Sequence, residues 1–348
     1  MVNVGIAGVG FMGWMHWLAY QRVEGAGVAA ICTRDEKKLA GDWTGIQGNF
    51  GPPGEQVDLT GIAGHNNLDD LIADPNVDLV DICLPPDMHV DAAIKAFEAG
   101  KHVLCEKPMA LTPEGCDQMV EAAAKANRQL LIGHVLVYFP EYVYARKVID
   151  SGQYGKVLGG TFKRVISDPT WLKDFYDPKR VGGPLIDLHV HDAHFIRVLF
   201  GMPTAVNTVG RMRGDVVEYN LTNFSFDDPS LVVNATCGVI NQQGRGFTHG
   251  FEIHLEKATL QYELAVIGGE GKLIVPLTVY EADGSVHEPD LGGGDEVTAF
   301  VGEIEETVKS VEANQPSSLL SGSLARDAIV ICQRQADSAA QRQTVSVR

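Results

Sequence analysis

Two short segments of the sequence carry side chains that could move a proton at a substrate. The first is Glu106-Lys107-Pro108, which directly follows the apolar run His102–Cys105. If that run is a strand of a parallel sheet, Glu106 and Lys107 lie at its carboxyl end, where such sheets bind ligands. A lysine there can donate to a substrate hydroxyl and relay its proton. An exposed Glu–Lys ion pair is the alternative interpretation.

The second segment runs from Gly182-Gly183 to His194 and contains Asp187 and His191. These two residues are four positions apart, so on an α-helix they share one face. A histidine with a pKa near neutral can take a proton from a substrate hydroxyl, and a neighbouring carboxylate can orient the substrate. A His189-x-His191 metal site would suit a strand better than a helix, so we predict no metal. A purely structural histidine cluster is the other alternative.

A glycine motif predicts a dinucleotide site near the start of the chain. Gly8-x-Gly10-x-x-Gly13 follows the apolar run Val2–Ala7 and opens a helical pattern that continues to about Arg22. In this setting the first glycine permits the turn, the second lets a pyrophosphate approach, and the third lets helix and strand pack. Phe11 and Met12, between the glycines, are predicted to contact the cofactor as well. A tight turn without a ligand is the alternative.

The residues about 20 positions after the motif bear on the choice between NAD and NADP. The chain has Thr33-Arg34 there, just past the apolar run 28–32. An acidic residue would bind the ribose 2′-hydroxyl, whereas a hydroxyl followed by a guanidinium attracts a 2′-phosphate. The pair therefore favours NADP. NAD stays open, because Asp35 is close and Arg34 could stack on the adenine.

The elements that must position these residues follow two patterns. Up to residue 134, strand-like runs at 2–7, 28–32, 77–84, 102–105 and 129–133 alternate with helical stretches that include 88–99 and 113–127. This alternation is typical of a doubly wound parallel sheet, an α/β Rossmann domain over residues 1–134. Residues 41–64, rich in glycine and proline, are interpreted as an insertion before a short third strand.

Beyond residue 150 the strand-like runs follow one another, separated by turn signals such as Asp283-Gly284. This succession predicts a large, mostly antiparallel sheet in an α+β domain over residues 135–348. In this division the C-terminal helix and tail can pack back on the first domain, and the ligand is expected between the two domains. The runs are 156–166, 204–212, 216–226, 231–240, 249–256, 258–267 and 272–280, with helices near 183–200, 295–313 and 322–340.

Composition excludes several classes of partner. The 348 residues include 28 basic and 45 acidic side chains, a net charge of −17. Nucleic acid and anionic membrane surfaces would repel such a chain, and no apolar run approaches the ~20 residues of a membrane helix. The six cysteines form no C-x-x-C pair, which favours free thiols in a reducing compartment. The first strand begins almost at Met1 and leaves no room for a signal peptide, so we expect a cytoplasmic protein.

The motifs together resemble the Gfo/Idh/MocA oxidoreductases, named after glucose–fructose oxidoreductase and inositol 2-dehydrogenase. The resemblance rests on Gly8–Gly13, on Leu84-Pro-Pro-Asp-Met-His89 and above all on Gly100-Lys-His-Val-Leu-Cys-Glu-Lys-Pro108. It implies that Lys107 is catalytic and precedes a cis proline, that His191 is the base, and that Asp187 orients the substrate. It also implies cofactor contacts, and these include Leu84, Pro85, His89, Glu106 and Lys107.

The sequence departs from the family pattern in two places that bear on the substrate. His134-Val-Leu-Val137 stands where relatives often carry Asn-Arg-Arg-Phe, and His189 stands where they often have glycine. We predict that Lys107, His134, Trp171, Asp187 and His191 bind the substrate. Trp171 could instead only pack at the domain junction.

The resemblance implies an NAD(P)-dependent dehydrogenase that interconverts an alcohol and a ketone on a sugar, inositol or related polyol. Two alternatives remain: a glycosidase that oxidises its substrate transiently and regenerates bound NAD, and a non-catalytic sensor of dinucleotide or sugar. Because one face of a large sheet would be free of helices, we also predict a homodimer or homotetramer through that face.

Overall fold

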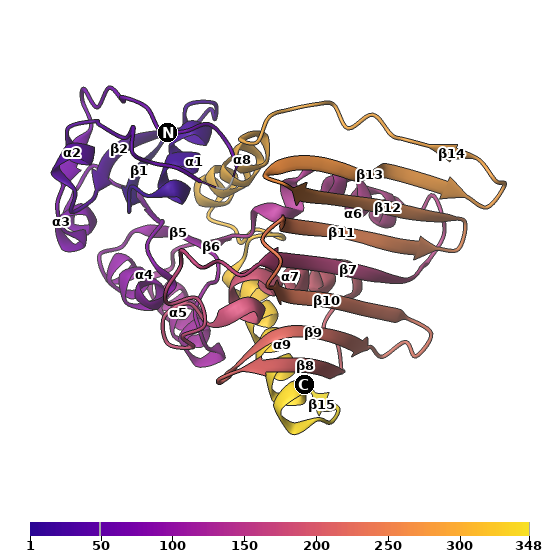
Figure 1. Cartoon of the computed structure of the whole chain (residues 1–348). Coiled ribbons are helices and arrows are strands. Elements are labelled where there is room, and N and C mark those ends of the chain that lie inside the picture. Colours follow the sequence, from indigo (N-terminus) through magenta and orange to yellow (C-terminus); the bar gives the residue numbers. More distant parts are fainter. Residues whose placement is uncertain (49, 348) are drawn as a thin grey trace. The chain divides into compact units, whose positions relative to one another are not determined.

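Six parallel strands form the sheet of the first unit of the computed structural model, which describes residues 1–48 and 50–347 (Figure 1). Their order is β3-β2-β1-β4-β5-β6, so the order reverses between β1 and β4, where doubly wound sheets bind their ligands. The predicted Rossmann sheet is confirmed. The strands are β1 Val2–Ala7, β2 Ala26–Cys32, β3 Ala63–His65, β4 Leu79–Ile82, β5 His102–Glu106 and β6 Leu130–Gly133.

The helices of this unit begin and end at recognisable signals. Thr112 caps α5 by accepting from the backbone N–H of Gly115, Pro113 occupies the first turn, and Asn127 ends the helix in the left-handed conformation. The others are α1 Phe11–Tyr20, α2 Glu36–Leu39, α3 Leu68–Ala73 and α4 His89–Glu98, with α5 at Pro113–Ala126 and single 3₁₀ turns at Pro86–Met88 and Val135–Tyr138. The predicted insertion ends earlier than expected, because β3 begins at Ala63.

The first unit also takes in a later stretch of the chain. It comprises Met1–Tyr138 and Gly294–Arg326, so residues 294–326 belong here rather than to the second domain, which the sequence analysis drew as 135–348. The physical reason is α8 (Thr298–Ala313), which contacts α1 and β1. Its side chains Phe300, Ile304 and Val308 are buried.

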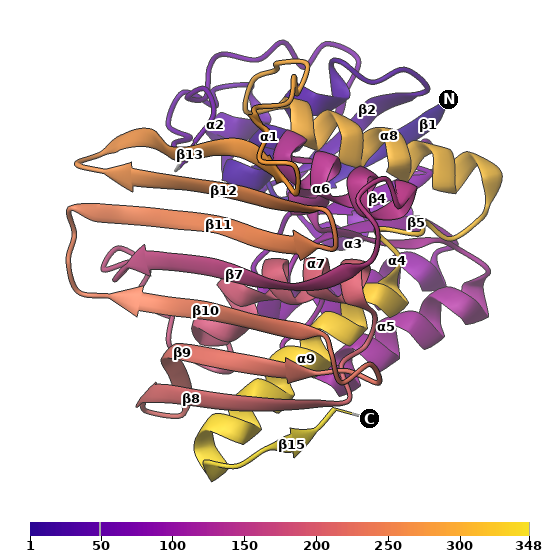
Figure 2. The same ribbon diagram turned by 90° about the vertical axis from the view of Figure 1, so that its right-hand side faces the viewer.

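Nine strands form the sheet of the second unit, Phe139–Gly293 with the residues from Asp327 onward (Figure 2). Their order is β14-β13-β12-β11-β7-β10-β9-β8-β15. The predicted mostly antiparallel sheet is confirmed, and the exception is the pair β7 and β10, which runs parallel. The strands are β7 Val157–Ser167, β8 Ala205–Arg213, β9 Val216–Ser225, β10 Val232–Ile240, β11 Arg245–Leu255, β12 Ala258–Ile267, β13 Glu270–Glu281, β14 Val286–His287 and β15 Val345–Ser346.

Helices cover one face of this sheet. Tyr142 of α6 (Pro140–Ser151) packs edge-on against Phe251 of β11, and Phe195 of α7 (Val190–Phe200) packs against Phe162 of β7. From α9 (Gly322–Gln341), Gln335 donates to the hydroxyl of Thr222 on β9. The helix α6 was not predicted. None of the described helices is long and apolar enough to cross a membrane.

The opposite face of the sheet carries rows of mainly polar side chains. Asn234, Thr161 and Glu252 lie on neighbouring strands in register, and Lys163 pairs with Glu263 at 3.0 Å. Three large apolar side chains stand among them: Val209, Leu221 and Val232 are 73%, 44% and 70% exposed. This face is therefore mainly polar, with exposed apolar side chains at a few positions.

Candidate active site

The glycine turn between β1 and α1 has the shape that a bound pyrophosphate requires. Gly8 adopts a φ of +105°, and an added Cβ there would lie 2.5 Å from the carbonyl oxygen of Cys83. A Cβ on Gly13 would lie 2.1 Å from the carbonyl oxygen of Gly8. At Gly10, by contrast, a Cβ would meet no described atom within 4 Å. Space thus opens in front of Gly10 at the start of α1, beside the half-buried Phe11 and Met12, so these residues fit a dinucleotide phosphate.

The predicted ribose contacts lie at the end of β2. The backbone N–H of Thr33 donates to the carbonyl of His65 at 3.0 Å, and the Arg34 side chain is exposed. The Asp35 carboxylate accepts from the backbone N–H of Lys37 at 2.9 Å, as the cap of α2. Asp35 thus already serves the chain's own backbone, while the guanidinium next to it faces solvent.

Lys107 follows the last residue of β5, and its peptide bond to Pro108 is cis, as predicted. Its backbone N–H donates to Oε2 of Glu106 at 3.1 Å. Glu106 is only 4% exposed, so the alternative of an exposed surface ion pair is wrong. The carboxylate of Glu106 is part of the protein interior, and Lys107 itself is half-buried.

His89 is fully buried and lies between two loops of the candidate site. Its ring nitrogens are 2.9 Å from the carbonyl oxygen of Pro108 and 2.8 Å from that of Leu84. Burial lowers the pKa of this imidazole. These contacts support a role in holding the two loops together, in place of the predicted direct contact with the cofactor. Leu84 and Pro85, half-buried and exposed, remain predicted cofactor contacts.

His134 follows β6 directly, beside the strand that leads to Lys107. Its side chain is fully buried, and its backbone N–H donates to the carbonyl of Ile132 at 2.7 Å. Its place at the carboxyl end of a parallel strand fits a ligand site, and its contact with the substrate stays a prediction.

In the second unit, Asp187 and His191 lie where a π-turn meets an α-helix. Residues Leu185–His189 form the π-turn, and α7 continues from Val190. A π-turn closes i to i+5 instead of i to i+4, and the shared face of Asp187 and His191 stays a prediction. Gly182 and Gly183, with φ of +88° and +73°, shape the chain just before this turn.

Burial separates the polar residues of this segment into two groups. His189, Asp192 and His194 are at most 1% exposed, whereas Asp187 and His191 are half-buried. Asp192 accepts two hydrogen bonds from the Arg164 guanidinium, at 2.8 and 3.0 Å, and burial lowers the pKa of His189 to about 4. Asp187 and His191 are thus less buried than the other three, and their contact with a substrate stays a prediction.

The two halves of the predicted site belong to different units. Lys107 and His134 lie in the first unit, and Trp171, Asp187 and His191 lie in the second. Trp171 is 67% exposed, in the chain between β7 and the π-turn. Joint action of Lys107 and His191 on one substrate stays a prediction.

A group of buried polar residues next to Glu106 was not predicted from the sequence. His16 on α1 contacts both Glu106 and Asp81, and Glu303 of α8 lies close by. The sequence offers only one local signal for this group, a histidine three positions after Gly13, because the four residues come from four separate elements of the first unit.

Comparisons with known proteins agree with this architecture. Residues 2–134 match the profile described as "Oxidoreductase family, NAD-binding Rossmann fold", and residues 142–261 match the "GFO/IDH/MocA C-terminal domain". The chain is 34% identical over 159 residues to inositol 2-dehydrogenase 2 of Saccharopolyspora erythraea, covering 45% of this chain and 43% of that protein. It is 31% identical over 220 residues to levoglucosan dehydrogenase of Pseudarthrobacter phenanthrenivorans, covering 60% and 53%. The chain thus spans about half the length of these curated relatives.

A solved structure shows the same fold over the whole chain. A levoglucosan dehydrogenase in complex with NADH and levoglucosan superimposes with a TM-score of 0.78 over 99% of both chains, at 24% identity. At this identity the likeness supports the fold alone.

Proposed function

Because the chain belongs to the Gfo/Idh/MocA oxidoreductase family, we propose that it transfers hydride between a nicotinamide dinucleotide and a secondary alcohol or ketone of a sugar, inositol or related polyol. One observation carries the proposal. Lys107 stands at the carboxyl end of β5, in the sheet whose glycine turn has room for a pyrophosphate. The relatives named as dehydrogenases of inositol and levoglucosan support the substrate class.

Each protein group has a definite task in this reaction. The backbone at Gly10 and the start of α1 hold the phosphates, and the nicotinamide accepts or returns the hydride when it is bound. Lys107 donates a hydrogen bond to the reacting oxygen. His191 takes the hydroxyl proton during oxidation and returns it during reduction, and Asp187 orients the substrate.

The test is a panel of sugars, inositols and sugar acids with NAD and with NADP, followed at the nicotinamide absorbance. On the best substrate, Lys107→Ala and His191→Ala should each lower kcat about 10²- to 10⁴-fold and leave the dinucleotide Kd within a few-fold of the wild type. Lys95→Ala and His254→Ala, whose side chains are 43% and 45% exposed, are the matched controls.

Near-normal turnover of both site variants would refute the assignment. Loss of substrate without any net change in absorbance would point instead to transient oxidation. Binding of a dinucleotide without turnover of any member of the panel would point to a sensor.

We further propose that NADP is preferred. The exposed Arg34 guanidinium and the use of the Asp35 carboxylate as a helix cap support this choice. A hydrogen bond between charged groups contributes about 1.5–3 kcal/mol, so Arg34→Ala should raise the Kd of NADPH about 10- to 150-fold and leave that of NADH nearly unchanged. An equal effect on the two cofactors would contradict the preference.

We also propose that the chain assembles as a homodimer or homotetramer through the helix-free face of the second sheet. The exposed Val209, Leu221 and Val232 on that face support an interface there. Sedimentation should show the oligomer at micromolar concentration, and Leu221→Asp should weaken it. A wild-type monomer would refute the proposal.

We also propose a cytoplasmic location. The six free thiols support it, and cell fractionation can test it.

A further inference from the structure

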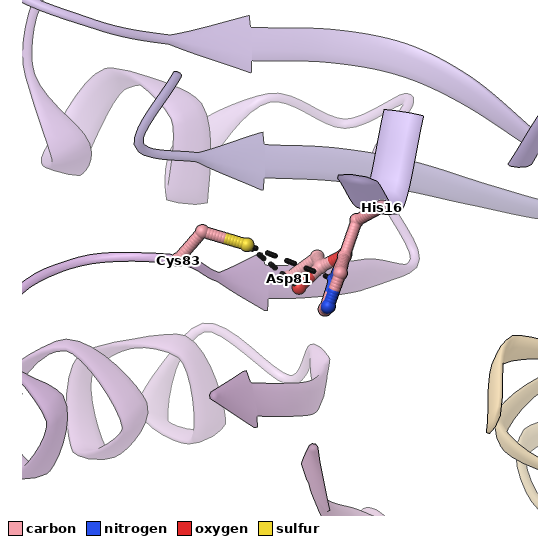
Figure 3. Close-up of side chains that lie close together, drawn as sticks. All are labelled: His16, Asp81 and Cys83. Carbon is pink, nitrogen blue, oxygen red and sulfur yellow. Dashed lines mark hydrogen bonds and ion pairs between the residues drawn. The ribbon is translucent and has the colours of Figure 1, made fainter. Parts of the chain in front are cut away.

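The group of buried polar residues next to Glu106 is centred on the His16 imidazole, and Figure 3 shows part of it. Nδ1 of His16 lies 2.8 Å from Oδ2 of Asp81 on β4, and Nε2 lies 3.0 Å from Oε1 of Glu106 on β5. Nε2 is also 3.7 Å from Oε1 of Glu303 on α8. All four side chains are at most 5% exposed.

The contacts determine how the imidazole is protonated. A neutral ring carries one N–H and would turn the lone pair of its other nitrogen toward a carboxylate. Since a carboxylate faces each nitrogen of His16, only the doubly protonated ring is attracted on both sides. Burial lowers the pKa of His16, but its interactions with Asp81 and Cys83 together outweigh burial and hold the pKa well above its usual value.

Three further side chains, Glu303, Tyr20 and Cys83, lie close to His16 or to its partner Asp81. Burial raises the pKa of Glu303 well above its usual value. Its oxygens have no hydrogen-bond partner among the described residues. Tyr20 donates its hydroxyl proton to Asp81 at 3.0 Å, and the Cys83 thiol donates to the same carboxylate at 3.5 Å (Figure 3). The His16 ring thus lies between the carboxylates of Asp81 and Glu106.

A metal ion is the competing explanation, because His16, Asp81 and Cys83 are ligand types that zinc accepts. Two ligands at ~2.1 Å on a tetrahedral zinc lie roughly 3.4 Å apart. The 2.8 Å between the His16 nitrogen and the Asp81 oxygen is shorter and is an ordinary charge-assisted hydrogen bond. The distance therefore favours a proton over a metal between them.

Glu106 connects this group to the candidate catalytic lysine. One oxygen of its carboxylate faces His16, and the other accepts the backbone N–H of Lys107 at 3.1 Å. By holding the first oxygen, the His16 ring keeps the second within hydrogen-bond distance of that amide. We propose that His16 is a positioning residue: clamped between Asp81 and Glu106, it orients the Glu106 carboxylate, which holds the main chain of Lys107 for hydride transfer. The inference rests on the proposed function.

Kinetics of His16→Gln test the positioning role, with Tyr20→Phe as the matched control. Both variants remove hydrogen bonds to Asp81, and only the first disturbs Glu106. His16→Gln should lower kcat 10- to 100-fold while the dinucleotide Kd changes less than threefold. Tyr20→Phe should keep kcat within twofold, whatever its loss in Tm. If kcat falls equally in both, or in neither, the positioning role is wrong.

A measurement on the wild type keeps the proposal testable if His16→Gln does not fold. Imidazole ¹⁵N NMR should show both ring nitrogens of His16 protonated at pH 8, and Asp81→Asn, which removes a carboxylate that raises the pKa of His16, should convert the ring to the neutral form. A neutral ring in the wild type, or one equivalent of metal by mass spectrometry, would overturn the proposal. If Lys107→Ala keeps full turnover, the proposed function fails. If Lys107→Ala loses turnover and His16→Gln does not, only this inference fails.

Discussion

Alanine substitutions at Gly10 and Gly13 separate the two tasks of the glycine turn, cofactor binding and folding. At Gly13 the new methyl group would lie 2.1 Å from the carbonyl oxygen of Gly8, a backbone atom that can move only if α1 shifts from β1. Overpacking of this kind costs about 1–3 kcal/mol. At Gly10 the backbone is extended, with φ −103° and ψ −158°, and no described atom lies within 4 Å of the new methyl. Gly10→Ala should therefore change the free energy of unfolding by at most about 1 kcal/mol.

Gly10→Ala, which should affect stability less than Gly13→Ala, should instead weaken cofactor binding. The methyl group of Gly10→Ala fills the space in which a pyrophosphate would meet the start of α1. Losing one hydrogen bond to a charged phosphate costs about 1.5–3 kcal/mol, so the Kd for NADH and NADPH should rise about 10- to 150-fold. Urea unfolding gives the stability, and isothermal titration calorimetry gives the Kd. A Gly10→Ala variant that binds dinucleotide like the wild type, or that unfolds as easily as Gly13→Ala, would refute the reasoning.

Two further predictions concern the buried ionisable groups of the second unit. Asp192→Asn leaves the Arg164 guanidinium buried without its anion and should cost about 3–5 kcal/mol in urea unfolding; the exposed pair Arg22–Asp295 provides the control, because Asp295→Asn should cost less than about 1 kcal/mol. Burial lowers the pKa of His189 to about 4, so the folded state loses stability as pH falls from about 6.5 toward 4. The full shift amounts to about 3 kcal/mol, and a His189→Gln variant with the same acid-side loss as the wild type would contradict it.

The parts of the fold that were predicted from the sequence are those in which local pattern and tertiary position agree. Buried strands such as Val2–Ala7 read as apolar runs, and the glycine motif marks the turn that follows. The helix α6 was missed although Pro140 in its first turn and Gly152 after its end are ordinary signals. The parallel pairing of β7 with β10 leaves no local mark, because register between distant strands depends on the whole sheet.

The candidate site also contains parts that could be predicted from the sequence and parts that could not. Lys107 could be found because Glu-Lys-Pro is contiguous, and Asp187 and His191 because they are four positions apart. The π-turn that contains Asp187 could not be predicted, since a change from i→i+4 to i→i+5 bonding has no fixed sequence signal. The pairing of His16 with Glu106 was also beyond reach, because those residues lie 90 positions apart and meet only when α1 packs against the sheet.

Two buried imidazoles, those of His16 and His89, help to hold the main chain around Lys107. His16 acts on the peptide before the lysine through the carboxylate of Glu106, and His89 contacts the carbonyl of Pro108 after it. Proton transfer to a substrate oxygen tolerates little displacement, so a main chain held on both sides lets the long lysine side chain reach one place reproducibly. The same reasoning explains why these ionisable side chains are buried here. Polar side chains are costly to bury, and the hydrogen bonds that compensate this cost hold the residue at the centre of the proposed reaction.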